Sequence, residues 1–538
     1  MPQAGSKVEF DYIVIGAGPA GAAVARRLAE APSHPSVAVI EAGGAKAPLL
    51  SDMPLGMALL MPWKNRWNYA FRTEPQPGLN GRRGYQPRGR GIGGSSLINA
   101  MICIRGQPED YDEWAAQGCA GWSFADVLPL FQRLEANSRG ASDWHGEFGP
   151  LVVSDPRHTN PATEAFIRAG KECGYNHNPD FNGPSQEGFG AYQLFQREGR
   201  RLNAGRAYLQ EGPRLPNLCI LAETQAERIL FSDGRANAVR LRRGTQSFDV
   251  TARREIVLSA GAFGSPQLLM LSGIGPAAEL AQHGIAVFAD RQDVGENLQD
   301  HLDFTTNLRM KAPGLFGLNL STAARGAVDL VRWMRRGEGM FTSNAAEGGA
   351  FLRSSPTVSR PDLQLHFCIG FVDDHNRNIH LGTGMALHVC ALRPASRGRV
   401  GLRSAEARDA PLIDPRFLSA PEDMEILVRG VGIVRRILAA PSLARFGGRP
   451  IHGIGTEEGE ALRDLIRLHA DTIYHPVGTC RMGADASSVV DPRLRVRGVA
   501  GLRVADASIM PQLISGNTQA PSAMIGEKAA DLILHEEQ

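Results

Sequence analysis

The sequence predicts a mixed protein of the α/β and α+β classes. One domain should alternate parallel strands with helices, and a second should be built on an antiparallel sheet. Residues 10–41 read as a strand, a glycine-rich turn, a helix and a second strand. Two more glycine-rich stretches occupy residues 89–101 and 259–275. Alternating apolar segments with turn-forming residues between them fill much of the range 301–460, which is typical of antiparallel strands.

The first unit has the pattern of a Rossmann-like nucleotide-binding domain. Its apolar run FDYIVIG is suited to a buried parallel strand and ends at Gly16. Gly16 permits a tight turn, Gly18 lets the backbone approach a pyrophosphate, and Gly21 allows close packing of helix on strand. The helix that follows would offer free N–H groups to phosphates. Glu41, at the end of the second strand, is placed to bind ribose hydroxyls. We therefore predict a dinucleotide site.

The other two glycine-rich stretches each allow two interpretations. In GRGIGGSSLINAM, residues 89–101, the small residues and hydroxyls could line a cofactor, or the stretch could be an ordinary flexible loop. SAGAFGSPQLLMLSGIG, residues 259–275, follows the strand-like EIVL and could be simply a strand–turn–helix element of the core. Neither stretch decides between its interpretations when taken alone.

The range 301–460 has a different sequence pattern. LQLHFCIGF and ALHVCALRP alternate like strands, with the turn-forming DDHNRN and PASRGR close to them. AVDLVRWMRRGEG predicts an amphipathic helix, which suits a membrane surface but is more often a solvated helix face. EDMEILVRGVGIVRRILAA predicts a long helix that leads back toward the first domain.

Composition narrows the class of protein. The chain has 538 residues, 43% hydrophobic and 21% charged, which indicates a globular protein of two domains. A formal net charge of +2 gives no reason to expect a nucleic-acid partner. The seven cysteines are odd in number and contain no CxxC pair, so we expect neither a disulfide framework nor a metal site.

Localisation is also an expectation from the sequence. The N-terminus lacks the pattern of a secretory signal, and no apolar run reaches the length needed to cross a bilayer. We therefore expect a cytoplasmic protein, with peripheral association with the inner face of the membrane left open.

One histidine stands in a stiff local setting. In IYHPVGTC, residues 473–480, His475 directly precedes a proline, which restricts its backbone to extended conformations. It could be a histidine packed on a turn or a positioned proton acceptor, and the octapeptide alone favours the first.

Together these stretches resemble the glucose–methanol–choline (GMC) family of flavin oxidoreductases over essentially the whole chain. GRGIGGSSLIN is similar to the first family signature, and GAFGSPQLLMLSGIG matches the second at every restricted position. HPVGT and SGNTQAP match the C-terminal block. Three separate signatures and the N-terminal turn make a coincidence improbable.

The resemblance implies a flavin domain that is discontinuous in sequence and binds FAD. Its three parts would be residues 1–157, 206–300 and 461–538, the last of which carries the catalytic residues. Residues 158–205 would be an insertion that belongs to the substrate domain, and residues 301–460 would form the body of that domain with its antiparallel sheet.

Stretches such as PLGMALLMP and FTSNAAEGGAFLR look most like bacterial FAD-dependent alcohol dehydrogenases, which act on primary alcohols. Some family members tether FAD through a histidine two residues ahead of Ala100, but Ile98 has no nucleophile there, so the resemblance implies non-covalent FAD. Cys103 departs from the first signature, which usually has an aromatic residue or alanine, and this leaves the packing near the flavin open.

The resemblance also assigns site residues. His475 would be the base that takes the hydroxyl proton, because the pKa of histidine lies near neutrality, and Asn517 would donate a hydrogen bond to the same oxygen. Asn517 could also be a helix N-cap. His301 and His366 would be structural or pocket-lining. The cofactor-binding residues would be Gly16, Gly18, Gly21, Glu41, Arg90, Gly94, Ser95, Asn99, Ala100, Met101, Ala226, Ala260, Asp506 and Thr518.

Three functions remain in competition. The first is an alcohol dehydrogenase that passes electrons to a quinone or another carrier. The second is an oxidase that reduces O2 to hydrogen peroxide, like hydroxymethylfurfural or aryl-alcohol oxidases. The third is a non-redox flavoprotein such as the hydroxynitrile lyase of this family. The sequence identifies neither the alcohol nor the oligomeric state.

Overall fold

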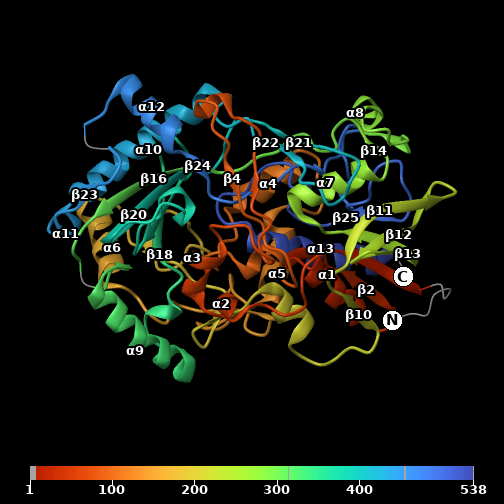
Figure 1. Ribbon diagram of the computed structural model, residues 1–538, viewed down its shortest axis with the longest axis horizontal. Helices are drawn as coiled ribbons and strands as arrows, with labels where there is room; N and C mark the ends of the chain where they lie inside the picture. The colour runs from red at the N-terminus through yellow and green to blue at the C-terminus, as the bar shows by residue number, and fades with distance from the viewer. Residues whose placement is uncertain (1–7, 313, 454–455, 537–538) are drawn as a thin grey trace.

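The computed structural model describes residues 8–312, 314–453 and 456–536, so residues 1–7 and the last two residues of the predicted flavin domain lie outside it. Its strands form two large sheets, and each has its own cluster of buried apolar side chains. In Figure 1 the first sheet lies at the right, near both chain ends, and the second lies at the left beside helices α10 and α12. The predicted mixed α/β and α+β class is confirmed.

In the described chain the first sheet has seven strands, in the order β10-β2-β1-β13-β12-β11, with β25 also paired to β13. Strands β10, β2, β1, β13 and β25 run parallel, whereas β13, β12 and β11 form an antiparallel meander. The bounds are β1 (Val8–Ile15), β2 (Val37–Ile40), β10 (Leu218–Leu221), β11 (Gln225–Ser232), β12 (Arg235–Arg243), β13 (Gln246–Leu258) and β25 (Leu502–Val504).

The predicted strand–turn–helix–strand unit is present at the centre of this sheet. Helix α1 (Pro19–Ala29) begins directly after the glycine turn, with proline at its first position, where no N–H is needed. Helix α13 (Gln519–Glu536) crosses it so closely that a Cβ on Gly526 would lie 2.3 Å from the carbonyl oxygen of Ala20. The C-terminal helix therefore belongs to the same core as the nucleotide unit.

The second sheet is antiparallel throughout, in the order β23-β16-β20-β19-β18-β7, with β17 paired to β20 and β24 to β16. Strand β7 comes from the range 158–205 and β24 from the range 461–538, so three separated parts of the chain build this sheet. The domain boundaries themselves stay predictions. The bounds are β7 (Gly188–Ala191), β16 (Leu302–Arg309), β17 (Gly317–Leu318), β18 (Ala346–Leu352), β19 (Leu363–Cys368), β20 (Gly382–Ala391), β23 (Arg449–Pro450) and β24 (Asp471–Thr472).

The predicted long helix is α10 (Pro421–Ala439), which packs with α6 (Pro161–Glu172), α11 (Pro441–Ala444) and α12 (Gly459–His469) near the second sheet. The predicted amphipathic helix is α9 (Leu320–Arg336). It projects at the lower left of Figure 1, and Trp333 anchors it by donating its indole N–H to the carbonyl of Gly199 at 3.0 Å. None of the helices in the described ranges has the length and apolarity that a bilayer span requires.

Shorter elements connect these layers. The helices are α2 (Leu49–Asp52), α3 (Met57–Leu60), α4 (Pro108–Ala116), α5 (Phe124–Leu134), α7 (Gly261–Leu271) and α8 (Ala277–Gln282), with 3₁₀ turns at η1 (Pro54–Gly56), η2 (Pro77–Leu79), η3 (Gly94–Leu97), η5 (Met340–Thr342), η6 (Asp374–Asn376) and η7 (Ala507–Ile509) and a π turn at η4 (Arg206–Gln210). The strands are β3 (Phe71–Arg72), β4 (Tyr85–Gln86), β5 (Glu135–Asn137), β6 (Leu151–Val153), β8 (Gln196–Arg197), β9 (Arg200–Arg201), β14 (Ile274–Gly275), β15 (Ala289–Asp290), β21 (Arg399–Gly401) and β22 (Leu412–Asp414).

Candidate active site

A cavity of about 710 Å³ is lined by residues from both sheets and from the loops that join them. Its volume lies within the range of small-molecule and cofactor sites. Every site residue that we predicted lines it except Gly21. A Cβ on Gly21 would lie 2.0 Å from the carbonyl oxygen of Gly16, so this glycine serves the close helix–strand packing that the sequence predicts.

One end of the cavity is formed by the nucleotide unit. Gly16 has a φ of 103°, in the region that favours glycine. A Cβ on Gly18 would meet no heavy atom within 4 Å, and no side chain caps α1 there, so the N-terminus of the helix opens onto free space. The carboxylate of Glu41 accepts hydrogen bonds from the N–H groups of Ala17, Gly43 and Gly91 at 2.8–3.1 Å. Burial raises its pKa.

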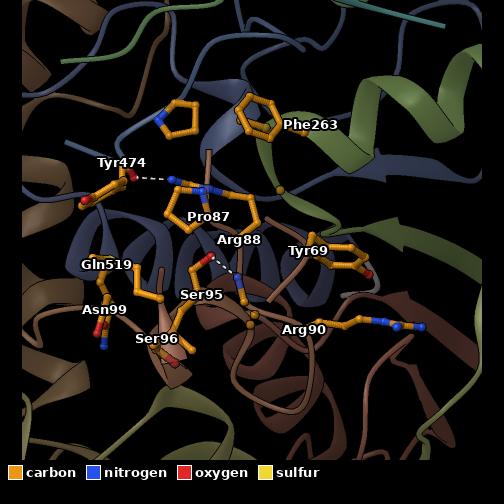
Figure 2. A pocket seen from close by; sticks show the side chains of 18 of the residues that line it. Tyr69, Pro87, Arg88, Arg90, Ser95, Ser96, Asn99, Phe263, Tyr474 and Gln519 are labelled. Carbon is orange, nitrogen blue, oxygen red and sulfur yellow. Dashed lines mark hydrogen bonds between the residues drawn. The ribbon is translucent and has the colours of Figure 1, made fainter. Parts of the chain in front are cut away.

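The loop of residues 89–101 forms a wall of the cavity. Figure 2 shows Ser95, whose hydroxyl accepts the N–H of Gly89 at 3.1 Å. Asn99 donates to the side-chain carbonyl of Gln519 at 2.5 Å, which joins this loop to the start of α13. The guanidinium of Arg90 lies 5.5 Å from the centre of the Tyr69 ring. The stretch therefore lines the cavity and is hydrogen-bonded to α13, which favours the cofactor-lining interpretation.

Asp506 holds a second helix N-terminus at the cavity. One of its carboxylate oxygens accepts the N–H of Gly261 at 2.8 Å and the hydroxyl of Ser265 at 2.5 Å. The other accepts the N–H of Ser508 at 2.8 Å. Burial raises the pKa of Asp506. Ala260 lies at the N-cap of α7, and Ala226 lies on β11.

His475 and Asn517 lie together, with 3.2 Å between His475 Nε2 and Asn517 Nδ2. Asn517 lies two residues before the first residue of α13. The backbone around His475 is held from two sides. Its N–H donates to Asp300 Oδ1 at 2.8 Å. The carbonyl of Tyr474 accepts from the guanidinium of Arg88 at 2.9 Å, and Figure 2 shows this hydrogen bond.

The hydrogen bonds around His475 define its tautomer. His301 Nε2 lies 2.9 Å from the carbonyl oxygen of Leu392, which can only accept, so Nε2 carries the proton. The neutral His301 then has an unprotonated Nδ1, which lies 2.9 Å from His475 Nδ1 and accepts a hydrogen bond from the N–H of that nitrogen. This leaves the lone pair of His475 on Nε2. Nε2 accepts from the amide of Asn517, whose oxygen in turn accepts from Gln364 at 3.1 Å.

The charges of the buried histidines differ. Burial, together with His301, His366 and Arg88, holds the pKa of His475 well below its usual value. Burial lowers the pKa of His301 to about 4. Both imidazoles are therefore neutral near pH 7 and can form the row of hydrogen bonds just described.

Two more histidines line the cavity, His366 on β19 and His388 on β20. Burial and the neighbouring histidines hold the pKa of His366 well below its usual value, and within the described chain its two ring nitrogens are buried without a hydrogen-bond partner. Burial disfavours the charged form of His388, but the carboxylate of Asp303, at 2.6 Å, overcomes this and raises the pKa to about 10. His388 and Asp303 therefore form a buried ion pair, of which His388 lines the cavity.

Some of these residues were missed by sequence reasoning. Arg88 directly precedes the first glycine signature, and Asp300 is the neighbour of His301, but no spacing rule connects either one to His475. His301 was expected to be structural or pocket-lining, and the structure gives it contact with His475. Cys103 is buried and is not among the cavity-lining residues of the described chain.

Comparisons with known proteins are consistent along the whole chain. Two family models, both described as GMC oxidoreductase, match residues 10–303 and 394–526. An alcohol dehydrogenase (acceptor) of Pseudomonas putida is 47% identical over 98% of this chain and 96% of that protein. An oxygen-dependent choline dehydrogenase of Rhizobium etli is 42% identical with the same coverage. The crystal structure of pyridoxine 4-oxidase from Mesorbium loti has a TM-score of 0.87 at 31% identity, covering 98% of this chain and 99% of that one.

Proposed function

The chain belongs to the GMC oxidoreductase family of FAD-dependent enzymes that act on CH–OH groups, and from this premise we propose that it oxidises an uncharged primary alcohol to an aldehyde. The observation that carries the proposal is the row of hydrogen bonds that leaves His475 Nε2 as an acceptor at the cavity wall, beside the amide of Asn517.

The cavity fits FAD. The open N-terminus of α1 at Gly18 suits a pyrophosphate, and Glu41 lies where a ribose would be bound. The residues that would hold the cofactor are Gly16, Gly18, Glu41, Arg90, Gly94, Ser95, Asn99, Ala100, Met101, Ala226, Ala260, Asp506 and Thr518, all of which line the cavity, with Gly21 packed behind the turn. We propose that binding is non-covalent, because Ile98 offers no nucleophile at the tethering position.

The protein residues would handle the proton of the reaction. When bound, FAD supplies the acceptor for the hydride that leaves the alcohol carbon. A hydroxyl placed between His475 and Asn517 would donate to Nε2 of His475 and accept from Nδ2 of Asn517. His475 then takes the proton, and the amide of Asn517 stabilises the negative charge that develops on the oxygen. Because His475 is neutral near pH 7, it can accept that proton without first losing one.

The wall beyond His475 suits an uncharged substrate. It includes the aromatic rings of Phe316 and Phe371 and the aliphatic side chain of Ile473. The charged group that we identify there is the imidazolium of His388, whose partner Asp303 is not among the cavity-lining residues of the described chain. A quaternary ammonium group would meet the imidazolium of this ion pair and not its carboxylate, although choline dehydrogenases are among the relatives. We therefore propose an aliphatic or aromatic alcohol without a cationic group.

We propose a quinone as the electron acceptor and an anionic bilayer as the surface where the enzyme meets it. Trp333 is buried on the side of α9 that faces the rest of the protein. The opposite side exposes apolar side chains, with Leu320 91% exposed and Val328 62% exposed. Arg332, Arg335 and Arg336 on the same helix suit anionic headgroups. The exposed apolar patch consists of Leu318, Leu320, Val328, Val331, Met334, Ile379 and Leu381.

This apolar patch lies close to the cavity in the fold. Leu318 forms an isolated β-bridge with Leu381. Phe316, which is two residues before Leu318, lines the cavity. A hydrophobic alcohol or quinone dissolved in a membrane would therefore have a short path to the site. The oxidase function is the second candidate, because pyridoxine 4-oxidase is among the similar structures.

Anaerobic flavin reduction tests the proposed function. The purified flavoprotein is mixed with hexan-1-ol, benzyl alcohol or choline in a stopped-flow instrument, and the loss of flavin absorbance is recorded. We expect the two uncharged alcohols to reduce the flavin and choline to be at least 10-fold slower at equal concentration. We expect His475→Gln to retain FAD but to slow reduction by 10²- to 10⁴-fold, the usual contribution of a general base.

The reduced enzyme is then mixed with a soluble quinone or with oxygenated buffer. Faster reoxidation by the quinone supports the dehydrogenase, and faster reoxidation by O2 with formation of hydrogen peroxide supports the oxidase. Choline as the best substrate would refute the charge argument. An unchanged reduction rate in His475→Gln would refute His475 as the base, and a flavin that no alcohol reduces would leave the non-redox function.

A further inference from the structure

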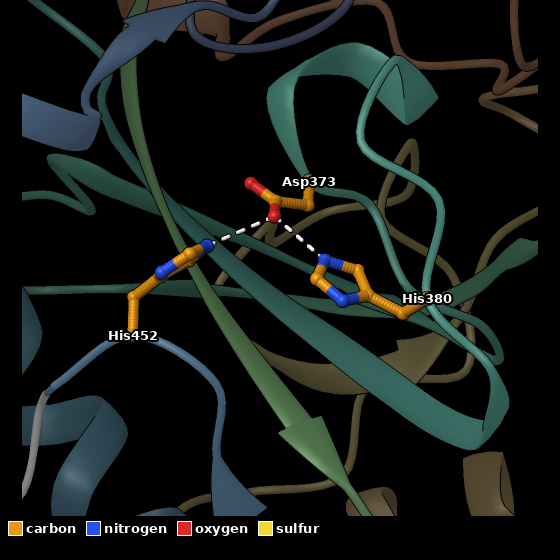
Figure 3. Close-up of side chains that lie close together, drawn as sticks. All are labelled: Asp373, His380 and His452. Carbon is orange, nitrogen blue, oxygen red and sulfur yellow. Dashed lines mark hydrogen bonds and ion pairs between the residues drawn. The ribbon is translucent and has the colours of Figure 1, made fainter.

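A second cluster of polar side chains lies outside the row around His475. Asp373 and His380 come from the loop between β19 and β20, and His452 follows β23; their ligand-type atoms all lie within 4.8 Å of one another. Figure 3 shows both imidazoles directed at the same carboxylate oxygen. Asp373 Oδ2 lies 2.7 Å from His380 Nε2 and 2.9 Å from His452 Nε2. The sequence predicts no metal site, because His452 is far along the chain from the other two.

The donor set is one that divalent transition metals use. Two imidazole nitrogens and one carboxylate oxygen are a common set of three protein ligands, with water at the remaining position. Zinc lies about 2.0–2.2 Å from such atoms, so two ligands in a tetrahedral site lie about 3.3 Å apart. Each imidazole would need to move about 0.5 Å away from Asp373 to admit the ion. A change of that size needs only small side-chain rotations.

Both imidazoles are held in place from behind. The ring of His380 lies 5.3 Å from the ring of Phe371, and the ring of His452 stacks on His469 at 4.6 Å with an angle of 21°. His452 is also 38% exposed, whereas the Asp373 side chain is 9% exposed. The cluster therefore combines oriented nitrogen ligands with a path to solvent, which a metal ion needs to enter.

The charge of the cluster also suits a cation. The ion-pair partners of Asp373 within the described chain are these two imidazoles, and the neighbouring Asp374 is paired separately with Arg377. A metal ion binds only neutral imidazoles, and with both in that form the cluster carries the net negative charge of one carboxylate. A divalent ion would compensate it.

We propose that Asp373, His380 and His452 bind a divalent transition metal, with zinc as the reference ion. The ion would join the loop between β19 and β20 to the segment that follows β23. That loop also borders the cavity, since Val372 and Asn376 line it, and His375 lies 2.6 Å from the hydroxyl of Tyr474, the residue before His475. Metal binding would therefore tie down one wall of the cavity without contact to His475.

Titration of zinc into the FAD-containing protein tests the proposal. Isothermal titration calorimetry should show one site with a dissociation constant in the micromolar range or tighter. Asp373→Asn keeps the size of the side chain but removes its charge, and His452→Ala removes a ligand, so each should weaken that site at least 10-fold. His34→Ala, at an exposed histidine in another part of the molecule, should leave it unchanged.

A structural readout completes the test. Anomalous diffraction from a zinc-soaked crystal should place the ion about 2.0–2.2 Å from the three ligand atoms, and zinc should raise the thermal midpoint of the wild type more than that of Asp373→Asn. FAD content and circular dichroism confirm that each variant is folded. Zinc bound equally well by wild type and Asp373→Asn, or no zinc bound at micromolar concentration, would overturn the proposal and leave a hydrogen-bonded clamp.

Discussion

A neighbouring residue determines which ring nitrogen of His475 can accept a proton. A free neutral imidazole can carry its proton on either nitrogen. Here the carbonyl of Leu392 sets the proton position in His301, and His301 sets it in His475, so the lone pair lies on Nε2, next to Asn517. His301 is thus a positioning residue, which acts on the reaction through the tautomer of the base.

Replacement of His301 should test this role. His301→Phe removes the acceptor for Nδ1 of His475, so part of the protein will have the proton on Nε2 and cannot act as a base. We expect anaerobic flavin reduction by the alcohol to slow by roughly 10- to 100-fold with KM little changed, less than the loss of the base itself. Stopped-flow reduction measures the rate.

His301→Gln is the matched control, because its amide can donate to Leu392 and accept from His475. It should recover most of the rate. If His301→Phe and His301→Gln lose the rate equally, or if neither does, the ring is simply part of the packing and the tautomer argument fails.

The residues that act directly were predictable from sequence, but their supports were not. His475 and Asn517 stand in short motifs that resemble family signatures. Arg88, Asp300 and His388 stand in no such motif. Arg88 follows β4, Asp300 precedes β16 and His388 lies on β20, and folding brings these distant segments to the site. Interactions between segments that are distant in sequence cannot be read from spacing.

Regular elements and the position of the turn after β19 followed from local pattern, but the backbone conformation of that turn did not. The strand at residues 10–16, the helices α9 and α10, and the antiparallel strands β19 and β20 all agree with apolar periodicity. The turn-forming stretch DDHNRN follows β19, as the sequence predicts, but its backbone angles cannot be read from periodicity. Asp374, His375 and Asn376 have φ values of 45°, 57° and 65°, a region that is uncommon for non-glycine residues but that Asp, His and Asn enter more readily than the others. Here Asp471 and Tyr474 hold His375.

Helix α9 gives a prediction at the scale of one element. Val331→Glu combined with Met334→Glu places two carboxylates in its exposed apolar face. We expect binding to vesicles of anionic phospholipid to fall at least 10-fold, because each buried apolar side chain contributes about 1.5–3 kcal/mol and anionic lipid repels the new charges. Co-sedimentation with vesicles measures this binding.

Leu468→Glu is the matched control, since Leu468 is 53% exposed on α12, which lies away from α9 in Figure 1. Vesicle binding that is absent in the wild type, or equal in all three proteins, would exclude α9 as a membrane-contacting surface. In each variant flavin reduction by a water-soluble alcohol should be unchanged, because α9 does not line the cavity.

At the scale of the whole molecule, buried histidines make stability depend on pH. His366 is buried with its pKa well below that of the unfolded chain, which lies near 6.5. Below about pH 6.5 the unfolded chain binds a proton that the folded protein does not, so stability is lost as pH falls. One such group costs about 1.4 kcal/mol per pH unit, or about 2 kcal/mol between pH 6.5 and 5.

His366→Phe should remove this dependence while it fills a similar volume. The thermal midpoint of the variant, measured with excess FAD, should fall by a few degrees less than that of the wild type between pH 7.5 and 5. His388 acts in the opposite sense, since its raised pKa stabilises the fold below about pH 6.5 and that contribution is lost as pH rises toward 10. Equal acid sensitivity in both proteins would show that His366 is protonated in the folded state.

The row of hydrogen bonds from Leu392 through His301, His475 and Asn517 to Gln364 has a consequence for how the protein is made. Gln364 lies on β19 and Leu392 directly follows β20 of the antiparallel sheet, whereas Asn517 leads into the helix that packs on the nucleotide unit. His475 can act as the base only when the antiparallel sheet and the nucleotide unit have packed together correctly. A chain that has bound FAD but docked its second half wrongly would be yellow and inactive, so turnover itself reports correct assembly.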